Sequence, residues 1–341
     1  MSNAVRDSLL LLVGLAVSAT IAAEDRLKIQ GIADGSNVVV MMDASKKAGG
    51  CSNDLVLRAS GDTGVGNVRR SSAACVAEVA IFSESNAMLL ETPVSAWTND
   101  PGDVHTVSLQ PIIDVPVSVW IADGGGTARP TAHTERTEEI YRKNKVGIHF
   151  VFTVRDVSAD AMAVAIIDGG IGLPQGSDNP ECRNIEKLQD SAFYTRKTLN
   201  VYYVALETTG RNCAFKLPPR DCKSAKEQPE ADGNITYIGA KAHRGVLAHE
   251  FGHAFGLRPG PCGGHTNGRA GFDKKNVMWV SKNKDMDHFS LGQVFRMNTH
   301  TDQWGGSMLI KNGLRPDPGR PCPPLAVSRT CPALKTAWPR P

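Results

Sequence analysis

The stretch from Ala240 to Leu257 reads AKAHRGVLAHEFGHAFGL, and its composition favours one helix. His249 and His253 lie four residues apart, so they project from nearly the same side of that helix, about one turn apart. Glu250 stands beside them. Apolar residues at helical spacing form the opposite side: Leu247, Phe251, Ala254 and Phe255. The sequence therefore predicts a helix with one side packed into a core and the other carrying ionisable groups.

The pattern H-E-x-x-H at positions 249 to 253 is the spacing with which two imidazoles bind one zinc ion while the glutamate acts as a base. With this many His and Glu, random placement would produce the pattern in only about 1% of chains. A catalytic zinc takes three protein ligands and keeps one position open for water. We therefore expect one Zn²⁺ ion held by His249, His253 and a third ligand, with Glu250 as the general base.

Two features after this helix separate the known classes of such sites. No Glu follows Glu250, which removes the gluzincin arrangement, in which a later Glu is the third ligand. Gly256 lies where a metzincin helix ends and turns back toward the metal, and Met278, in the sequence N-V-M-W, is similar to the metzincin Met-turn. The chain from about 113 to 313 therefore resembles the metzincin metallopeptidases, most nearly their secreted bacterial reprolysin-like and pappalysin-like members.

The third ligand is displaced relative to that family. The metzincin pattern H-E-x-x-H-x-x-G-x-x-H calls for a His at position 259, where this chain has Pro259. The next His is His265, which follows a glycine-rich insertion, and leishmanolysin-like metzincins also place their third His after an insertion. His265 is therefore the expected third ligand. The alternatives are Asp273, His288, His300 or no third protein ligand.

The resemblance implies an α+β catalytic domain with a twisted mixed sheet, a zinc helix and an apolar floor formed by Met278 beneath the ligands. It also implies a secreted zinc-dependent endopeptidase that cleaves protein or peptide substrates with a zinc-activated water and Glu250 as general base. Two alternatives stay open. One is a catalytically inactive metzincin-like binding or adhesion protein, and the other is a zinc hydrolase of a non-peptide amide.

The segments around the zinc helix alternate between strand and helix patterns. Strands are expected at 115–121, 146–154, 199–207 and 234–239, and further helices at 133–145 and 290–297. The order strand, helix, strand is typical of α/β or α+β domains. Asn234 opens an N-x-T glycosylation sequence, which hints at a position on the surface.

Residues 1–23 have the layout of a secretory signal peptide. Arg6 precedes an apolar run from Leu9 to Ala19, which is shorter than the stretch of about 20 residues needed to span a bilayer. Small side chains at positions 22 and 23 suit a signal peptidase. We expect a mature chain that begins near Glu24 and is secreted or periplasmic, without stable membrane insertion. An uncleaved anchor is the alternative.

The sequence on either side of residues 113–313 indicates a β-rich segment before them and a proline-rich tail after them. Residues 24–112 carry short β-branched runs between turn-forming clusters, so a small all-β domain is expected there, either a propeptide or a binding module. Residues 314–341 hold eight Pro, which disfavour both helix and inner strand, so a proline-rich tail is expected.

Cysteine content and net charge bound the compartment and the partners. The chain has eight Cys, an even number, which favours an oxidising compartment and complete pairing. The expected pairs are Cys51 with Cys75, Cys213 with Cys222, and Cys322 with Cys331 or with the body of the protein. The net charge is only +3, and the sequence has no strongly basic block, so nucleic acid is not an expected partner.

Overall fold

The structure of the chain is a computed structural model, and it describes part of the sequence. It gives the backbone of six strands between residues 24 and 108, and most of 112–315 with nearly all side chains. The stretches described in that second part are 112–144, 146–172, 184–207, 209–213, 234–257, 265–267, 274–280, 285–290, 293–294, 297–298 and 307–315. The predicted signal peptide, Pro259, Asp273, His300 and every cysteine except Cys213 lie outside the described residues.

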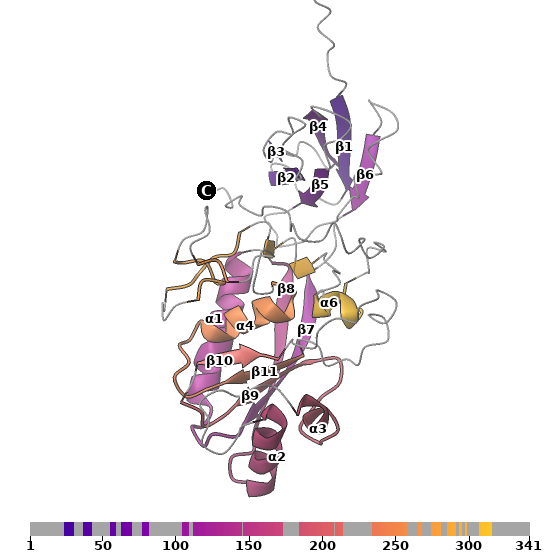
Figure 1. The fold of residues 1–341 in the computed structure, drawn as a ribbon. Helices are drawn as coiled ribbons and strands as arrows, with labels where there is room; N and C mark the ends of the chain where they lie inside the picture. Colours follow the sequence, from indigo (N-terminus) through magenta and orange to yellow (C-terminus); the bar gives the residue numbers. More distant parts are fainter. Residues whose placement is uncertain are drawn as a thin grey trace, which may run out of the picture.

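A five-stranded mixed sheet organises the larger part of the chain (Figure 1). Its strands are β7 (Ile113–Ile121), β8 (Ile148–Asp156), β9 (Leu199–Tyr203), β10 (Gly210–Asn212) and β11 (Ile235–Ile238), in the order β10-β11-β9-β7-β8. β7 is parallel to β8 and β9, and β9 is parallel to β11, whereas β10 is antiparallel to β11. The expected mixed sheet is confirmed, with the short β10 at one edge and β8 at the other.

Helices cover both faces of this sheet. α1 (Ala128–Lys143) and α4 (Val246–Ala254) contact each other and pack on one face, together with the short α6 (Met308–Lys311). α2 (Ala161–Ile171) and α3 (Ile185–Gln189) pack on the other face. Successive residues of β7 serve the two cores in turn, because side chains alternate along a strand: Val119 faces α1 and α4, and Trp120 faces α2 and α3.

Some element boundaries differ from the sequence-based expectation. The helix expected at 133–145 begins at Ala128, because Pro130 falls in its first turn, where a missing N–H is tolerated. α2 was not predicted, since a short and almost wholly apolar run does not distinguish helix from strand by periodicity. Its ends are nevertheless defined by the chain: the Asp160 carboxylate caps the first turn, and Gly172 adopts a left-handed conformation with φ 78°.

Between residues 24 and 108 all the described elements are strands. They are β1 (Glu24–Gln30), β2 (Asn37–Met42), β3 (Leu55–Arg58), β4 (Thr63–Arg69), β5 (Ala77–Ile81) and β6 (Val104–Ser108). They pair into two three-stranded sheets, β4-β1-β6 and β3-β2-β5. That they form a domain of their own, as a propeptide or a binding module, stays a prediction.

Three details qualify the sequence-based expectations. Asn234 is only 1% exposed and its carbonyl accepts the N–H of Asn200 at 2.7 Å, so the hint of a surface glycosylation site is wrong. Cys213 is buried and disulfide-bonded; its partner is not among the described residues, so its pairing with Cys222 stays a prediction. No helix in the described part of the chain combines the length and apolar character that crossing a membrane requires.

The packed region continues two residues past the expected start of the tail at position 314. Leu314 packs against the core on the α1 and α4 side. Arg315 is 3% exposed, and its guanidinium donates to Asn298 Oδ1 at 3.3 Å and to the Gly147 carbonyl at 3.0 Å. Leu314 and Arg315 thus pack with the described residues before them, and the proline-rich tail itself stays a prediction.

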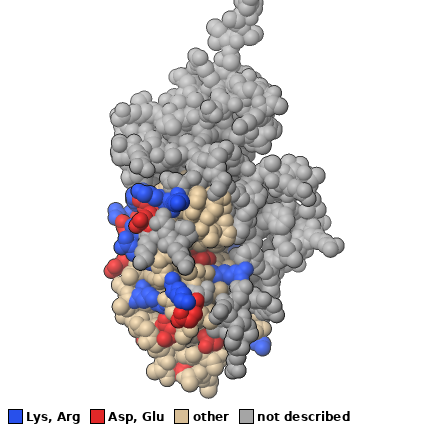
Figure 2. Space-filling model, turned by 60° about the vertical axis from the view of Figure 1, so that its left-hand side comes forward, with Lys and Arg blue, Asp and Glu red and all other residues tan. Residues whose placement is uncertain are grey.

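Charged side chains of both signs mix on the surface that the described residues form. Figure 2 shows basic and acidic groups next to each other on one face. Ion pairs join opposite charges among the described residues, including Arg136 with Glu139 at 2.6 Å and Lys143 with Asp287 at 2.8 Å. In the part that the structure describes, this face therefore carries no extended patch of one sign.

Candidate metal centre

α4 is held in place by a dense aromatic core beneath it. The ring centroid of Phe251 lies 5.1 Å from that of Phe150 on β8, and the centroid of Phe150 lies 4.9 Å from that of Tyr141 on α1. Every residue of α4 is buried, including the polar ones on its other side. Because burying ionisable groups is costly unless each has a partner, the partners of His249, Glu250 and His253 define what this side of the helix can do.

The backbone sets which nitrogen of each helical imidazole carries the proton. His249 Nδ1 lies 2.7 Å from the Val277 carbonyl, and His253 Nδ1 lies 2.5 Å from the Leu257 carbonyl. A carbonyl oxygen only accepts, so each Nδ1 donates, and each neutral ring presents a lone pair at Nε2. Those two Nε2 atoms are 3.1 Å apart. Two facing lone pairs at this distance repel each other unless a cation lies between them, so the pair is arranged to accept one.

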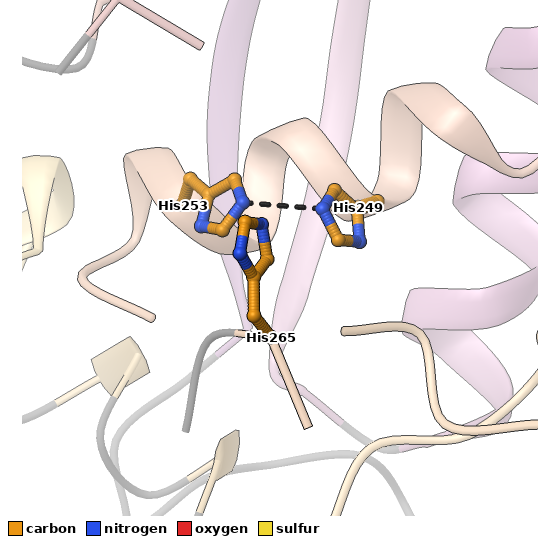
Figure 3. A group of neighbouring side chains, drawn as sticks. All are labelled: His249, His253 and His265. Atoms are coloured by element: carbon orange, nitrogen blue, oxygen red, sulfur yellow. Dashed lines mark hydrogen bonds between the residues drawn. The ribbon is translucent and has the colours of Figure 1, made fainter. Parts of the chain in front are cut away.

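His265 completes a group of three imidazoles (Figure 3). Its ring centroid is 5.6 Å from that of His249 and 5.0 Å from that of His253, and one ligand nitrogen from each ring lies within 4.8 Å of the others. The residue is half-buried and adopts φ 54°, a conformation that is uncommon outside glycine. The structure thus brings together the three His that the sequence suggested, and this group could hold a metal ion.

A glycine turn at the end of α4 supplies the partner of His253. Gly256 has φ 89°, and the N–H groups of Gly256 and Leu257 donate back to the carbonyls of His253 and Gly252. This is the Schellman arrangement, which needs a left-handed residue after the helix. It ends the helix and aims the Leu257 carbonyl at His253 Nδ1, so one turn of backbone both stops the helix and orients a ligand.

The segment 276–280, which we name the floor segment, packs on α4 and supplies the partner of His249. Met278 is fully buried and packs so tightly on α4 that a Cβ added at Gly252 would lie 2.5 Å from its Sδ. The Val277 carbonyl accepts from His249, while the Val277 N–H donates to the His288 carbonyl at 2.8 Å. Met278 therefore packs directly against α4 at Gly252, the residue before His253, and its role as an apolar floor beneath the ligands stays a prediction.

Glu250 is buried beside the imidazoles and is held from the edge of the sheet. Its Oε2 accepts the backbone N–H of Asn212 in β10 at 2.6 Å. Burial raises the pKa of Glu250 to about 7, against the opposing effects of that hydrogen bond and of the nearby Arg211 cation. Burial also lowers the pKa of His249, which favours the neutral form that a metal ligand requires. The site thus combines a His249 imidazole that favours its neutral form with a carboxyl group that can exchange a proton near neutral pH.

Among the described residues, none of the alternative third ligands lies in this group of imidazoles. His288 pairs through its backbone with Asn276 and its Nδ1 lies 3.2 Å from an oxygen of Asp287, outside the cluster of three imidazoles. Asp273 and His300 lie outside the described residues, so nothing is established about them.

Sequence reasoning missed a pair of buried amides that supports the floor of the site. Asn276 and Gln293 are fully buried and share two hydrogen bonds of 2.8 and 3.1 Å. Asn276 Oδ1 also accepts the N–H of Met278 at 3.0 Å. The pair therefore ties the floor to the segment around Gln293. The two residues are 17 positions apart in the sequence, so no local pattern joins them. The only signal was that each is an amide residue with an apolar neighbour.

Comparisons with known proteins do not assign the chain to a family. No family model and no curated protein matches it. Among solved structures, it is similar to metalloproteinase-II from Bacteroides fragilis at 12% identity and a TM-score of 0.37, covering 80% of this chain and 84% of that one. It is also similar, at 9% identity and a TM-score of 0.30, to a chain of a chaperone-substrate complex, covering 71% of this chain. The alignment spans only 35% of that second chain. Neither similarity is close enough to bear on fold or function.

Proposed function

We propose that the chain is a secreted zinc-dependent endopeptidase in which Glu250 is the general base. The observation that carries the proposal is the pair of Nε2 lone pairs of His249 and His253, 3.1 Å apart, with both Nδ1 atoms already committed to carbonyls. His265 lies beside this pair. The buried Glu250 next to them is the group that a hydrolase needs and that a purely structural metal site does not.

The donor set fits zinc in particular. Three neutral imidazoles with one open coordination position are the ligands of a hydrolytic zinc. With Zn–N bonds of about 2.0–2.1 Å, a tetrahedral ion would hold its nitrogens about 3.3–3.4 Å apart. The 3.1 Å between the Nε2 atoms of His249 and His253 is close to that spacing. The two carbonyls that accept from Nδ1 are the outer partners that orient metal-bound histidines. His249, His253 and His265 would hold the ion.

Glu250 is placed to move a proton. A zinc ion bound here would activate a water molecule and polarise the carbonyl of the scissile bond. Asn212 holds one oxygen of the Glu250 carboxylate, which leaves the other free to take the proton of the attacking water. The protonated carboxyl group can then pass that proton to the leaving amine. A pKa of about 7 suits both directions of transfer near neutral pH.

An extended peptide would be held by the sheet edge beside Glu250. β10 is the edge strand on the side of α4, and its Asn212 contacts Glu250. Pairing of a peptide main chain with an edge strand depends little on side chains, so it suits cleavage within unfolded or extended protein segments. The expected substrates are therefore proteins or peptides bound as an added strand next to β10.

The test measures metal content and proteolysis together. The full chain, Glu250→Gln and His265→Ala are analysed for zinc per chain and for cleavage of casein or gelatin. We expect one zinc per chain, and a loss of activity of about 100-fold or more in Glu250→Gln with its metal retained. His265→Ala should bind zinc more weakly. Glu138→Gln is the matched control, since Glu138 also accepts a backbone N–H of an edge strand, from Phe150 of β8 at 2.6 Å.

Other outcomes favour the alternatives. If the unmutated chain binds no zinc, the catalytic proposal fails and a binding or adhesion role becomes the better hypothesis. If it binds zinc but leaves denatured proteins intact while hydrolysing a small non-peptide amide, the second alternative holds. Equal proteolysis by the unmutated chain and Glu250→Gln would show that Glu250 is not the base.

Export is a separate part of the proposal and has its own test. The layout of residues 1–23 supports cleavage by a signal peptidase before Glu24. The chain is expressed in full in a host with a secretory pathway, and the protein outside the cytoplasm is sequenced from its N-terminus. We expect the sequence to begin at or near Glu24. Recovery of an intact chain in the cytoplasm would contradict secretion.

A further inference from the structure

We propose that Asn267 is the positioning residue for the third metal ligand, His265. This inference rests on the proposed metal centre and extends it. Two hydrogen bonds of 2.6 Å join the side-chain amide of Asn267 to the backbone of Val280 on the floor segment. These bonds fix the backbone next to His265, as the helix fixes the backbone of His249 and His253.

The helix alone cannot place His265. His249 and His253 are part of α4, so their separation follows from helical geometry. His265 follows α4 by more than ten residues and has a backbone φ of 54°. A residue in this uncommon conformation persists only where surrounding contacts hold it. Its ring contacts His249 and His253 on the helix, but its backbone conformation has to be held by contacts from outside the helix.

The segment 265–267 is held against the floor as a neighbouring strand would be. The N–H of Thr266 donates to the Met278 carbonyl at 3.0 Å. Asn267 Nδ2 then donates to the Val280 carbonyl, and Asn267 Oδ1 accepts the Val280 N–H, both at 2.6 Å. An asparagine amide has the donor and acceptor of a peptide group, so it can satisfy both backbone groups of one residue. Three hydrogen bonds thus lock the two residues after His265 onto residues 278 and 280.

Buried hydrogen bonds hold the floor segment itself in place. The buried pair of Asn276 and Gln293 fixes its start, and Asn276 Oδ1 accepts the N–H of Met278. The same segment orients His249 through the Val277 carbonyl. One short stretch therefore holds His249 on one side and His265 on the other. Loss of the Asn267 contacts should free His265 while leaving His249 and His253 in place.

The position of Asn267 makes this role separable from general stability. Its side chain is exposed, so truncation to alanine leaves no cavity in a core. Its hydrogen bonds reach only Val280 in the contacts described here, and neither bond touches a ligand. An effect of Asn267→Ala on metal affinity would therefore have to pass through one of the two segments that these bonds join: the segment that carries His265, or the floor segment that orients His249.

The experiment is a double-mutant cycle read out as Zn²⁺ affinity. The full chain, Asn267→Ala, His265→Ala and the double variant are titrated with Zn²⁺ in competition with a chromophoric chelator. We expect Asn267→Ala to weaken zinc binding by about 10- to 100-fold, as loss of an outer partner of a ligand does. In the His265→Ala background, Asn267→Ala should change the affinity by less than about twofold, because it has no ligand left to position. The visible spectrum of bound Co²⁺ should change in both single variants.

Controls keep the result interpretable. Asn184→Ala removes another asparagine amide that joins two segments, α2 and the start of α3, through a 3.1 Å bond to the Gly169 carbonyl on the far face of the sheet. It should leave zinc affinity unchanged. If Asn267→Ala does not fold by circular dichroism, Asn267→Asp replaces it. Asp still accepts the Val280 N–H but cannot donate, so an intermediate loss is expected.

Three results would overturn the inference. Unchanged zinc affinity and Co²⁺ spectrum in folded Asn267→Ala would show that His265 needs no such support. An equal loss with and without His265 would show that Asn267 acts through the floor segment and His249, or through general stability, and not through His265. If the unmutated chain binds no Zn²⁺, the metal centre and this inference fail together, whereas the first two results leave the metal centre standing.

Discussion

Among the described histidines, the atoms nearest the ring decide whether a residue can serve as a metal ligand. His249 and His253 donate at Nδ1 because carbonyls of Val277 and Leu257 face them, and in the neutral ring this leaves each Nε2 lone pair for a cation. His133, by contrast, is 2% exposed and its Nδ1 lies 3.1 Å from the hydroxyl of Tyr203. The same residue type is thus a candidate ligand in one place and a buried structural group in another.

Gly256 should matter for both stability and metal binding. Gly256→Ala places a side chain at φ 89°, which costs about 1 kcal/mol or more and displaces the Leu257 carbonyl from His253. We expect zinc affinity to fall by about 10- to 100-fold. Gly313→Ala is the control, since Gly313 follows α6 at φ 74° with open space around an added Cβ. It should cost similar stability, measured by urea unfolding, without weakening zinc binding, and similar zinc losses in both variants would contradict this account.

Burial of His133 should make the fold sensitive to acid. Burial, with smaller effects of Arg129 and His243, lowers the pKa of His133 from 6.5 to about 4. As pH falls below 6.5, His133 binds a proton in the unfolded chain but stays neutral in the folded chain. The free energy of unfolding therefore decreases until about pH 4, by on the order of 3 kcal/mol, and the effect then levels off.

The measurement compares the metal-free chain with His133→Gln across this pH range. Glutamine cannot take up the proton, so the difference in unfolding free energy between the two proteins should shrink as pH drops from 7.5 to 4. A difference that stays constant with pH would show that the pKa of His133 is not depressed in the folded state.

Among the elements, α2 and α3 pack so closely that the contact leaves no room for a side chain at Gly170 of α2. Gly170 lies on the buried side of α2, and a Cβ added there would lie 2.6 Å from Leu188 Cβ and 3.3 Å from Leu188 Cα. Its neighbour Gly169 is on the exposed side, with nothing within 4 Å of an added Cβ. Two adjacent glycines of one helix thus have opposite surroundings.

Alanine at these two positions should have opposite effects on stability. Gly170→Ala forces α2 and α3 apart and is expected to destabilise the fold by about 1–3 kcal/mol. Gly169→Ala should stabilise it by about 0.5–1 kcal/mol, because alanine favours helix and restricts the unfolded chain. Thermal unfolding of the two variants is the measurement. Equal changes of the same sign would mean that the two helices do not pack as described.

In the whole molecule, the candidate metal centre joins segments that are distant in sequence. It takes His249 and His253 from α4, His265 from the segment after it, and its floor from Val277 and Met278. β10 reaches the site through Glu250. A metal bound here would link these parts, so its binding energy should appear as stability of the fold.

Metal removal should therefore lower the melting temperature. At free zinc about 1,000 times the Kd, the folded chain gains about 4 kcal/mol over the metal-free one. Calorimetry with zinc and with chelator checks this, and the double variant His249→Ala/His253→Ala should respond to neither. A zinc-dependent shift of equal size in that double variant would place the bound metal elsewhere.

Much of the site could be predicted because its signals are local. H-E-x-x-H depends only on the helical repeat, and Gly256 marks the helix end through its own conformational freedom. Four of the five strands of the sheet, all except β10, were also indicated by their β-branched runs. α2 and β10 could not be predicted in this way, since one is a short apolar run and the other is three residues long.

Residue types and their spacing along the chain are enough to establish a helix with two histidines and a glutamate, and to suggest His265 as a third donor. Only the tertiary structure decides that His265 reaches the other two, that Val277 and Leu257 hold their rings, and that β10 holds Glu250. The reason is physical. Helical spacing is a property of neighbouring residues, whereas carbonyls and N–H groups are present at nearly every position and gain a role only when folding places one of them beside a particular side chain.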